Sequence, residues 1–178
     1  MIQIKFLGKG GQGVVVASEI LARACFEENL YPQCFSLYGG ERRGATVAAF
    51  VRVDEKKIYL KCDIDRPDHL ILLDKSLFNE KEVASQVDPG GSLLLNLEKD
   101  YPLDALKTFK VGRIDALEIS RKNGLGAIVN TAILGAYVRL SNLISLDTLL
   151  RVISETVPTA ADQNVMAAKE AYERLSIV

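Results

Sequence analysis

The sequence contains few of the side chains that bind metals or act as a catalyst by themselves. It has no tryptophan, one histidine (His69) and three cysteines, Cys25, Cys34 and Cys62, without any Cys-x-x-Cys pair. Disulfide frameworks use even, patterned cysteine sets, and zinc sites or iron–sulfur clusters normally need four clustered Cys or His ligands. We therefore expect reduced cysteines, and no zinc site or cluster held by this chain alone.

The sequence also has no marked excess of charge of one sign and no long apolar run. Lysine and arginine number 22 against 23 acidic residues, for a net charge of −1. A nucleic-acid or anionic-membrane binder usually has a basic excess, and no apolar run approaches the ~20 residues of a membrane span. The first residues alternate like a strand rather than forming a signal peptide. We expect a cytoplasmic protein that contacts neither nucleic acid nor membrane.

Size and composition are typical of a folded globular protein. The 178 residues are 48% hydrophobic and 25% charged, and a chain of this size buries ~70% of the surface that it exposes when unfolded. No repeat, low-complexity tract or linker interrupts the sequence. We expect one domain spanning residues 1–178.

The N-terminal part predicts a strand, a glycine loop, a helix and a second strand. Residues 2–7 alternate and are rich in large apolar and β-branched types, and residues 8–13 hold four glycines. Residues 14–29 show helical spacing, and residues 31–37 form a short apolar segment. Such a unit makes the second strand parallel to the first. The carboxyl ends of both strands then lie on one edge of the sheet, where ligands of open α/β sheets bind.

The rest of the chain predicts a mixed sheet with helices on both faces. We expect a Rossmann-like three-layer α/β sandwich, with a mostly parallel sheet, a β-hairpin insertion and a helical C-terminal part. The expected strands are 45–53 and 57–61, joined by a turn at 54–56, followed by 69–74, 92–96 and 110–114, and the expected helices are 79–87, 116–122, 127–142, 146–156 and 160–175.

The glycine loop has the pattern of a phosphate-binding turn. Gly8, Gly10 and Gly13 form Gly-x-Gly-x-x-Gly between a strand and a helix, where free N–H groups and the helix dipole favour an anion. A dinucleotide site also needs an acid at the end of the second strand, but the first one is Glu41, so we expect no NAD site. Without Gly-Lys-Ser or Gly-Lys-Thr, the loop is no Walker A motif. A turn whose glycines only permit close packing stays an alternative.

A second motif follows the second strand. Residues 38–44 read Tyr-Gly-Gly-Glu-Arg-Arg-Gly. Arg42 and Arg43 offer fork-shaped donors for phosphate or carboxylate, and Glu41 can pair with one of them. The flanking glycines favour a sharply bent loop whose backbone can come close to a ligand or to another chain. A small-molecule site, a contact with another subunit and a solvated charged loop are the alternatives here.

No set of residues predicts catalysis by this chain. There is no Ser/His/Asp arrangement with triad character, and His69 precedes a buried strand, which favours a structural role. Asp63, Asp65, Asp68 and Asp74 border expected strands, and nothing places two of them as a catalytic pair. We expect no catalytic residues and no enzyme that is active alone.

The two motifs together resemble one family. Their order and spacing are similar to those of the gamma subunit, or gamma domain, of 2-oxoacid:ferredoxin or flavodoxin oxidoreductases, which act on pyruvate, 2-ketoisovalerate or 2-oxoglutarate. The resemblance covers nearly the whole chain, although Ala45 stands where members often have glycine. The smaller subunit of indolepyruvate oxidoreductases, with a different second motif, is the second choice. The matching residues are Gly8, Gly10, Gly11, Gln12, Gly13, Tyr38, Gly39, Glu41, Arg43 and Gly44.

The resemblance implies a subunit of a larger enzyme. Such complexes oxidatively decarboxylate a 2-oxoacid, pass the acyl group to coenzyme A and pass electrons to ferredoxin or flavodoxin. Alpha, beta and ferredoxin-like delta subunits, or fused equivalents, would carry the thiamine diphosphate and the iron–sulfur clusters. This chain would contact coenzyme A phosphates or neighbouring subunits. A stand-alone phosphate-binding module is the alternative from another class. The expected contact residues are Gly8, Gly10, Gly11, Gln12, Gly13, Tyr38, Gly39, Glu41, Arg42 and Arg43.

Overall fold

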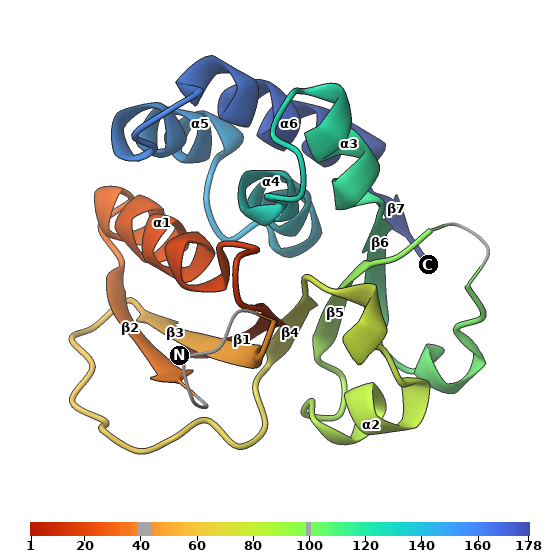
Figure 1. Cartoon of the computed structure of the whole chain (residues 1–178). Helices are drawn as coiled ribbons and strands as arrows, with labels where there is room; N and C mark the ends of the chain where they lie inside the picture. The colour runs from red at the N-terminus through yellow and green to blue at the C-terminus, as the bar shows by residue number, and fades with distance from the viewer. Residues whose placement is uncertain (39–43, 99–100) are drawn as a thin grey trace.

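The fold is built on one seven-stranded sheet in the order β2-β3-β1-β4-β5-β6-β7 (Figure 1). A computed structural model describes residues 1–38, 44–98 and 101–178. The strands are β1 (Ile2–Lys9), β2 (Tyr31–Tyr38), β3 (Thr46–Asp54), β4 (His69–Leu72), β5 (Ser92–Asn96), β6 (Lys110–Ile114) and β7 (Ser176–Ile177). The helices are α1 (Val14–Glu27), α2 (Glu80–Ser85), α3 (Ala116–Lys122), α4 (Asn130–Ser141), α5 (Leu146–Thr156) and α6 (Ala161–Arg174), with short 3₁₀ turns η1 (Lys75–Leu77) and η2 (Asp104–Leu106).

Helices cover the sheet on both faces, as the sequence predicts. α1, α3, α4, α5 and α6 lie on one side, while α2 and η2 lie on the other (Figure 1). The larger core joins Phe6 of β1 and Ile71 of β4 to the five-helix side. The smaller core joins Leu70 and Leu72 of β4 to Val83 of α2. Successive β4 residues thus enter opposite cores, which confirms a strand buried on both faces and the three-layer α/β class.

The strand pairings are both parallel and antiparallel. β1, β4, β5 and β6 pair in parallel, while β3 is antiparallel to β1 and β2, and β7 is antiparallel to β6. The chain leaves β1 towards α1, β2 and β3 on one side, and resumes at β4 on the other. The boundary between β1 and β4 is therefore the topological switch point of the sheet.

The predicted direction of the second strand relative to the first is confirmed, although the two strands are not neighbours in the sheet. β2 runs in the same direction as β1 but does not pair with it, because β3 lies between them and pairs with both. The register places Lys9 at the end of β1 opposite Thr46, and Tyr38 at the end of β2 opposite Val47. The carboxyl ends of β1 and β2 therefore do share one edge of the sheet, as expected.

The predicted hairpin partner of β3 at residues 57–61 is wrong. This segment has no strand structure, and the antiparallel partners of β3 are β1 and β2. Gln33 Nε2 donates to the carbonyl of Leu60 at 2.8 Å, and Arg52 Nη2 donates to the carbonyl of Cys62 at 2.5 Å. Because side chains satisfy these carbonyls, the segment can cross the sheet without a ladder.

Two of the helices, α3 and α5, begin at polar side chains that cap them. Asp115 accepts from the backbone N–H of Glu118 at 2.9 Å at the start of α3, and Ser145 accepts from Thr148 at 3.2 Å at the start of α5. Such caps satisfy otherwise free N–H groups of a first turn. Together with apolar spacing, they explain why both helices have the predicted bounds. Within the described parts of the chain, no helix is long and apolar enough to cross a membrane.

Candidate functional site

The glycine loop connects β1 to α1 at the switch point, in the strand–loop–helix context that the sequence predicts. Gly13 has a φ of 79° and stands at the N-cap of α1. A Cβ at Gly13 would lie 2.6 Å from Nδ2 of Asn130, and a Cβ at Gly8 would lie 2.7 Å from Cγ2 of Val14. Both positions therefore require glycine for close packing, whatever the loop binds.

The first turn of α1 provides free donors beside this loop. Among the described residues, no side chain caps the helix, and its first turn contains no acidic residue. The N–H groups of Val14, Val15 and Val16 therefore have no side-chain acceptor within the described part of the chain, and the helix dipole adds partial positive charge. Val16 is also 43% exposed. This end of α1 offers an anion-compatible surface with an apolar rim.

Gln12 holds the loop in place. Its Oε1 accepts from the backbone N–H of Lys9 at 2.8 Å, and its Nε2 donates to Oδ2 of Asp74 at 2.7 Å. Asp74 follows β4, accepts from the backbone N–H of Ser76 at 2.8 Å, and lies 3.9 Å from Nζ of Lys9. Burial alone would raise the pKa of Asp74, but the contacts with Ser76, Lys9 and Gln12 lower it. A charged Asp74 therefore joins the two strands of the switch point.

The structure brings the described ends of the second motif close to the glycine loop. The backbone N–H of Gly10 donates to the carbonyl of Ala45 at 3.0 Å. Ala45 directly precedes β3, and Tyr38 ends β2 beside it. The predicted residues Gly39, Glu41, Arg42 and Arg43 lie outside the described residues. The described ends of the second motif therefore lie at the glycine loop.

A crevice of about 230 Å³ opens beside Gln12 at the carboxyl ends of β4, β5 and β6. Its lining includes the carboxylates of Asp74, Glu98 and Asp115, against one cation, Lys75, which pairs with Glu98 at 2.6 Å. Polyphosphate would face these carboxylates at close range. The crevice is therefore suited to hydroxyl or amino groups, and phosphate fits better on the α1 side of the loop.

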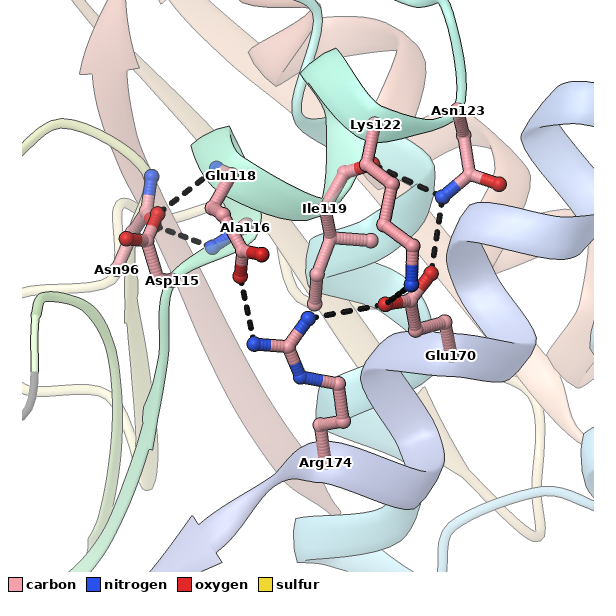
Figure 2. Close-up of polar contacts among 9 residues, drawn as sticks. All are labelled: Asn96, Asp115, Ala116, Glu118, Ile119, Lys122, Asn123, Glu170 and Arg174. Atoms are coloured by element: carbon pink, nitrogen blue, oxygen red, sulfur yellow. Dashed lines mark hydrogen bonds and ion pairs between the residues drawn. The ribbon is translucent and has the colours of Figure 1, made fainter.

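A second cavity, of about 480 Å³, continues along the same edge and contains Arg113 and Arg174. Figure 2 shows a polar network that includes two lining residues, Glu118 and Arg174: Glu118 and Glu170 accept hydrogen bonds from Arg174 at 2.6 and 2.9 Å. Asn96, at the end of β5, accepts from the backbone N–H of Ala116 at 2.9 Å. The sequence reasoning did not identify this network. Polar residues at the ends of two apolar strands were the signal that could have found it.

His69 has the structural role that the sequence favours. Its Nδ1 lies 2.6 Å from the hydroxyl of Tyr137, which is fully buried. Burial lowers the pKa of His69. In the parts of the chain that the structure describes, no three His, Cys, Asp or Glu side chains gather as a metal site, and Cys25, Cys34 and Cys62 are free.

These features define a doubly wound α/β domain with a glycine loop at its switch point. Comparisons with known sequences and structures assign this domain to a family. A sequence profile described as "Pyruvate ferredoxin/flavodoxin oxidoreductase" matches residues 3–174. The chain is 40% identical over 176 residues to the pyruvate synthase subunit PorC of Methanothermobacter marburgensis, covering 98% of each chain. It is 41% identical over 179 residues to the pyruvate/ketoisovalerate oxidoreductases common subunit gamma of Thermococcus kodakarensis, covering 98% and 97%.

Solved structures share this architecture. The pyruvate oxidoreductase subunit PORC of Thermotoga maritima superimposes with a TM-score of 0.83 at 29% identity, covering 99% of this chain and 97% of that one. The 2-oxoglutarate:ferredoxin oxidoreductase of Magnetococcus marinus has a TM-score of 0.80 at 22% identity, covering 98% of this chain and 31% of that longer one, which shows the fold alone. The chain belongs to the pyruvate ferredoxin/flavodoxin oxidoreductase family, as one of its gamma subunits.

Proposed function

We propose that the chain, as a single gamma-type domain, works in a complex that oxidatively decarboxylates a 2-oxoacid with coenzyme A. Its similarity to pyruvate synthase subunits over almost the full length of both chains carries this proposal, and pyruvate is the first candidate substrate. Alpha, beta and ferredoxin-like delta subunits would hold the thiamine diphosphate and the iron–sulfur clusters. Ferredoxin or flavodoxin would accept the electrons.

Substrate choice belongs to the partner subunits in this proposal. The Thermococcus relative is named as a gamma subunit common to pyruvate and ketoisovalerate oxidoreductases, so one such chain serves two substrates there. In the present chain, the crevice beside Gln12 is lined by several carboxylates, which would repel a 2-oxoacid. Both observations favour a role of this chain outside the decarboxylation site.

Coenzyme A phosphates are the proposed ligand of the glycine loop and of Arg42 and Arg43. The uncapped first turn of α1 supports this proposal, as does the hydrogen bond from Gly10 to Ala45 at the end of the arginine motif. Arginine forks bind phosphate well, and the apolar rim at Val16 suits the uncharged part of a nucleotide.

The first experiment is an anaerobic purification through a tag on this chain, followed by mass spectrometry and activity assays. We expect co-purifying chains with a thiamine diphosphate fold and cluster cysteines, and coenzyme A-dependent reduction of ferredoxin with pyruvate. The complex is then assayed with 2-ketoisovalerate, 2-oxoglutarate and indolepyruvate. Recovery of the chain alone would contradict the proposal and leave a stand-alone phosphate-binding module.

The second experiment replaces Arg42 and Arg43 together by alanine. We expect the KM for coenzyme A to rise about tenfold or more, because one lost charge-assisted contact changes binding by at least ~1.4 kcal/mol. kcat and the KM for the 2-oxoacid should stay within twofold. Arg121→Ala, at an exposed position of α3, is the control. An unchanged KM for coenzyme A together with unchanged assembly would refute the role of the arginine loop.

A further inference from the structure

The side chain of Asn130 lies at the glycine loop, although it comes from the second half of the chain. Asn130 is the first residue of α4 and is 6% exposed. A Cβ at Gly13, the N-cap of α1, would lie 2.6 Å from Nδ2 of Asn130 and 2.9 Å from its Cγ. The amide of Asn130 therefore faces the start of α1, and α1 and α4 lie side by side (Figure 1).

One end of this amide is paired, whereas the other end has no partner in the described part of the chain. Oδ1 accepts from the backbone N–H of Thr131 at 2.8 Å, and this donor identifies the oxygen end of the amide. For Nδ2, residues 1–38, 44–98 and 101–178 supply no hydrogen-bond acceptor. A buried donor without an acceptor costs free energy. Asn130 thus presents a donor to a group that these residues do not contain.

α4 begins in the same way as α1. Among the described residues, neither helix has a side-chain cap, and neither has an acid in its first turn. The first hydrogen bond of α4 runs from the N–H of Ile133 to the carbonyl of Val129, so the N–H groups of Asn130 and Ala132 precede the helical ladder. Such groups carry the partial positive charge of a helix N-terminus. Because Asn130 contacts Gly13, two positive helix ends meet at the glycine loop.

Buried contacts hold the start of α4 in position. Thr131 is fully buried, and its Oγ1 donates to Oδ1 of Asn164 in α6 at 2.9 Å. One turn later, Gly135 packs so closely on the backbone of Ala168 that a Cβ has no room. The amide of Asn130 is therefore fixed before any ligand binds, and a fixed donor loses little conformational entropy on binding.

The groups that meet at Gly13 suit a phosphate group. Backbone N–H groups and the –NH2 end of an amide are donors, and several N–H groups at a helix N-terminus are a typical phosphate site. Gly13 has no side chain, so that a ligand oxygen can come close to the backbone. A site that combines two helix starts and an amide donor binds a phosphate more firmly than the first turn of α1 alone.

We propose that Asn130 and the first turn of α4 complete the phosphate site at the glycine loop. Nδ2 of Asn130 donates to a phosphate oxygen of coenzyme A, while the N–H groups at the start of α1 bind the other oxygens. This inference rests on the proposed contact of the glycine loop with coenzyme A, and it adds a binding residue from α4 that belongs to neither sequence motif.

The test uses the complete complex with two substitutions of one residue. Asn130→Asp keeps an oxygen that accepts from Thr131, and a carboxylate suits a helix N-terminus, so the fold and the assembly should be retained. It also places a negative charge against the phosphate, and we expect the KM for coenzyme A to rise about a hundredfold or more. Asn130→Ala removes only the donor, and the KM should rise about tenfold.

A larger effect of aspartate than of alanine is the result that a structural role does not give. If Asn130 served only the fold, Asn130→Asp would be the milder change, because it keeps the contact with Thr131. kcat and the KM for pyruvate should stay within twofold in both variants. Asn79→Asp, which makes the same change at the exposed N-cap of α2, is the matched control and should leave all three constants unchanged.

Three results would overturn the proposal. The first is a KM for coenzyme A that Asn130→Asp leaves unchanged or raises less than Asn130→Ala does. The second is loss of the chain from the complex with Asn130→Asp, which would assign the amide to the fold. The third is a rise in the KM for pyruvate instead of coenzyme A, because the ligand would then be a carboxylate.

Failure of this inference differs from failure of the proposed function. If the variant with Arg42 and Arg43 replaced raises the KM for coenzyme A and Asn130→Asp does not, only the role of Asn130 is refuted. If neither variant changes this KM, coenzyme A does not bind at this edge of the sheet. Recovery of the chain without partner subunits would refute the complex itself.

Discussion

Gln12 in the glycine loop donates a 2.7 Å hydrogen bond from its side-chain amide to the carboxylate of Asp74, which follows β4. This bond crosses the switch point, so the loop after β1 and the turn after β4 are held as one unit. The conformation of the glycine loop therefore depends on a residue more than sixty positions later in the chain.

The Gln12–Asp74 pair should be energetically coupled. Gln12→Ala and Asp74→Ala should each lower the free energy of unfolding by about 1–2 kcal/mol, because each leaves partly buried polar groups without a partner. The double variant should lose less than the sum, by about 1 kcal/mol. Urea unfolding of all four proteins measures the coupling. Strict additivity would show that the bond contributes nothing to stability.

Glu170 should make stability depend on acid pH. Hydrogen bonds from Lys122, and then from Arg174 and Asn123, outweigh burial and lower the pKa of Glu170 to about 2 (Figure 2). A carboxyl group with a depressed pKa stabilises the fold fully above its unfolded pKa of ~4.3, and this stabilisation is lost as the pH falls towards 2. The partners are solvent-exposed, so the effect is about 1–2 kcal/mol.

The check compares the wild type with Glu170→Gln by urea unfolding between pH 7 and pH 3. The variant should be less stable at pH 7, and the difference should shrink as the pH falls below 4.5. Glu173→Gln, also on α6, is the matched control. A difference that is constant over this pH range would argue against ionic stabilisation by Glu170.

Arg52 should fix the irregular segment 57–63, which follows β3. Arg52→Lys keeps the charge but cannot reach the carbonyls of Cys62 and Asp63 and the amide of Gln33 together. We expect a loss of about 2–3 kcal/mol, the usual effect of breaking buried hydrogen bonds to a charged group. Hydrogen exchange should rise in residues 57–64 more than in α4. Unchanged exchange there would mean that other contacts hold the segment.

The crossing of α4 and α6 should tolerate no side chain at Gly135. A Cβ there would lie 1.9 Å from the backbone carbonyl oxygen of Ala168, so one helix must move. Gly135→Ala should cost more than about 3 kcal/mol despite the better helix propensity of alanine. A Cβ at Gly112 would lie 3.1 and 3.2 Å from the side-chain ends of Leu140 and Leu175, which can shift. Gly112→Ala should therefore cost under about 1 kcal/mol, and thermal unfolding of both variants separates the two cases.

The sequence by itself determined the elements whose signals are local. Apolar runs predicted β5 (Ser92–Asn96) and β6 (Lys110–Ile114) with their observed bounds. The helical ranges predicted for α3 and α5 likewise have the observed bounds. The glycine spacing predicted the strand–loop–helix turn, because positive φ and close packing act within a few residues. The two motifs together also identified the family.

Only the tertiary structure decided the partners of these elements. Nothing near β2 shows that β3 inserts between it and β1, since strand pairing is a contact between distant residues. Residues 57–61 are apolar enough for a strand. However, the side chains of Gln33 and Arg52 donate hydrogen bonds to backbone carbonyls in and directly after this segment, in place of a neighbouring strand. β7 is two residues long and exists through pairing with β6. The Gln12–Asp74 bond likewise needs the whole sheet, because its two side chains meet only when β1 and β4 lie side by side.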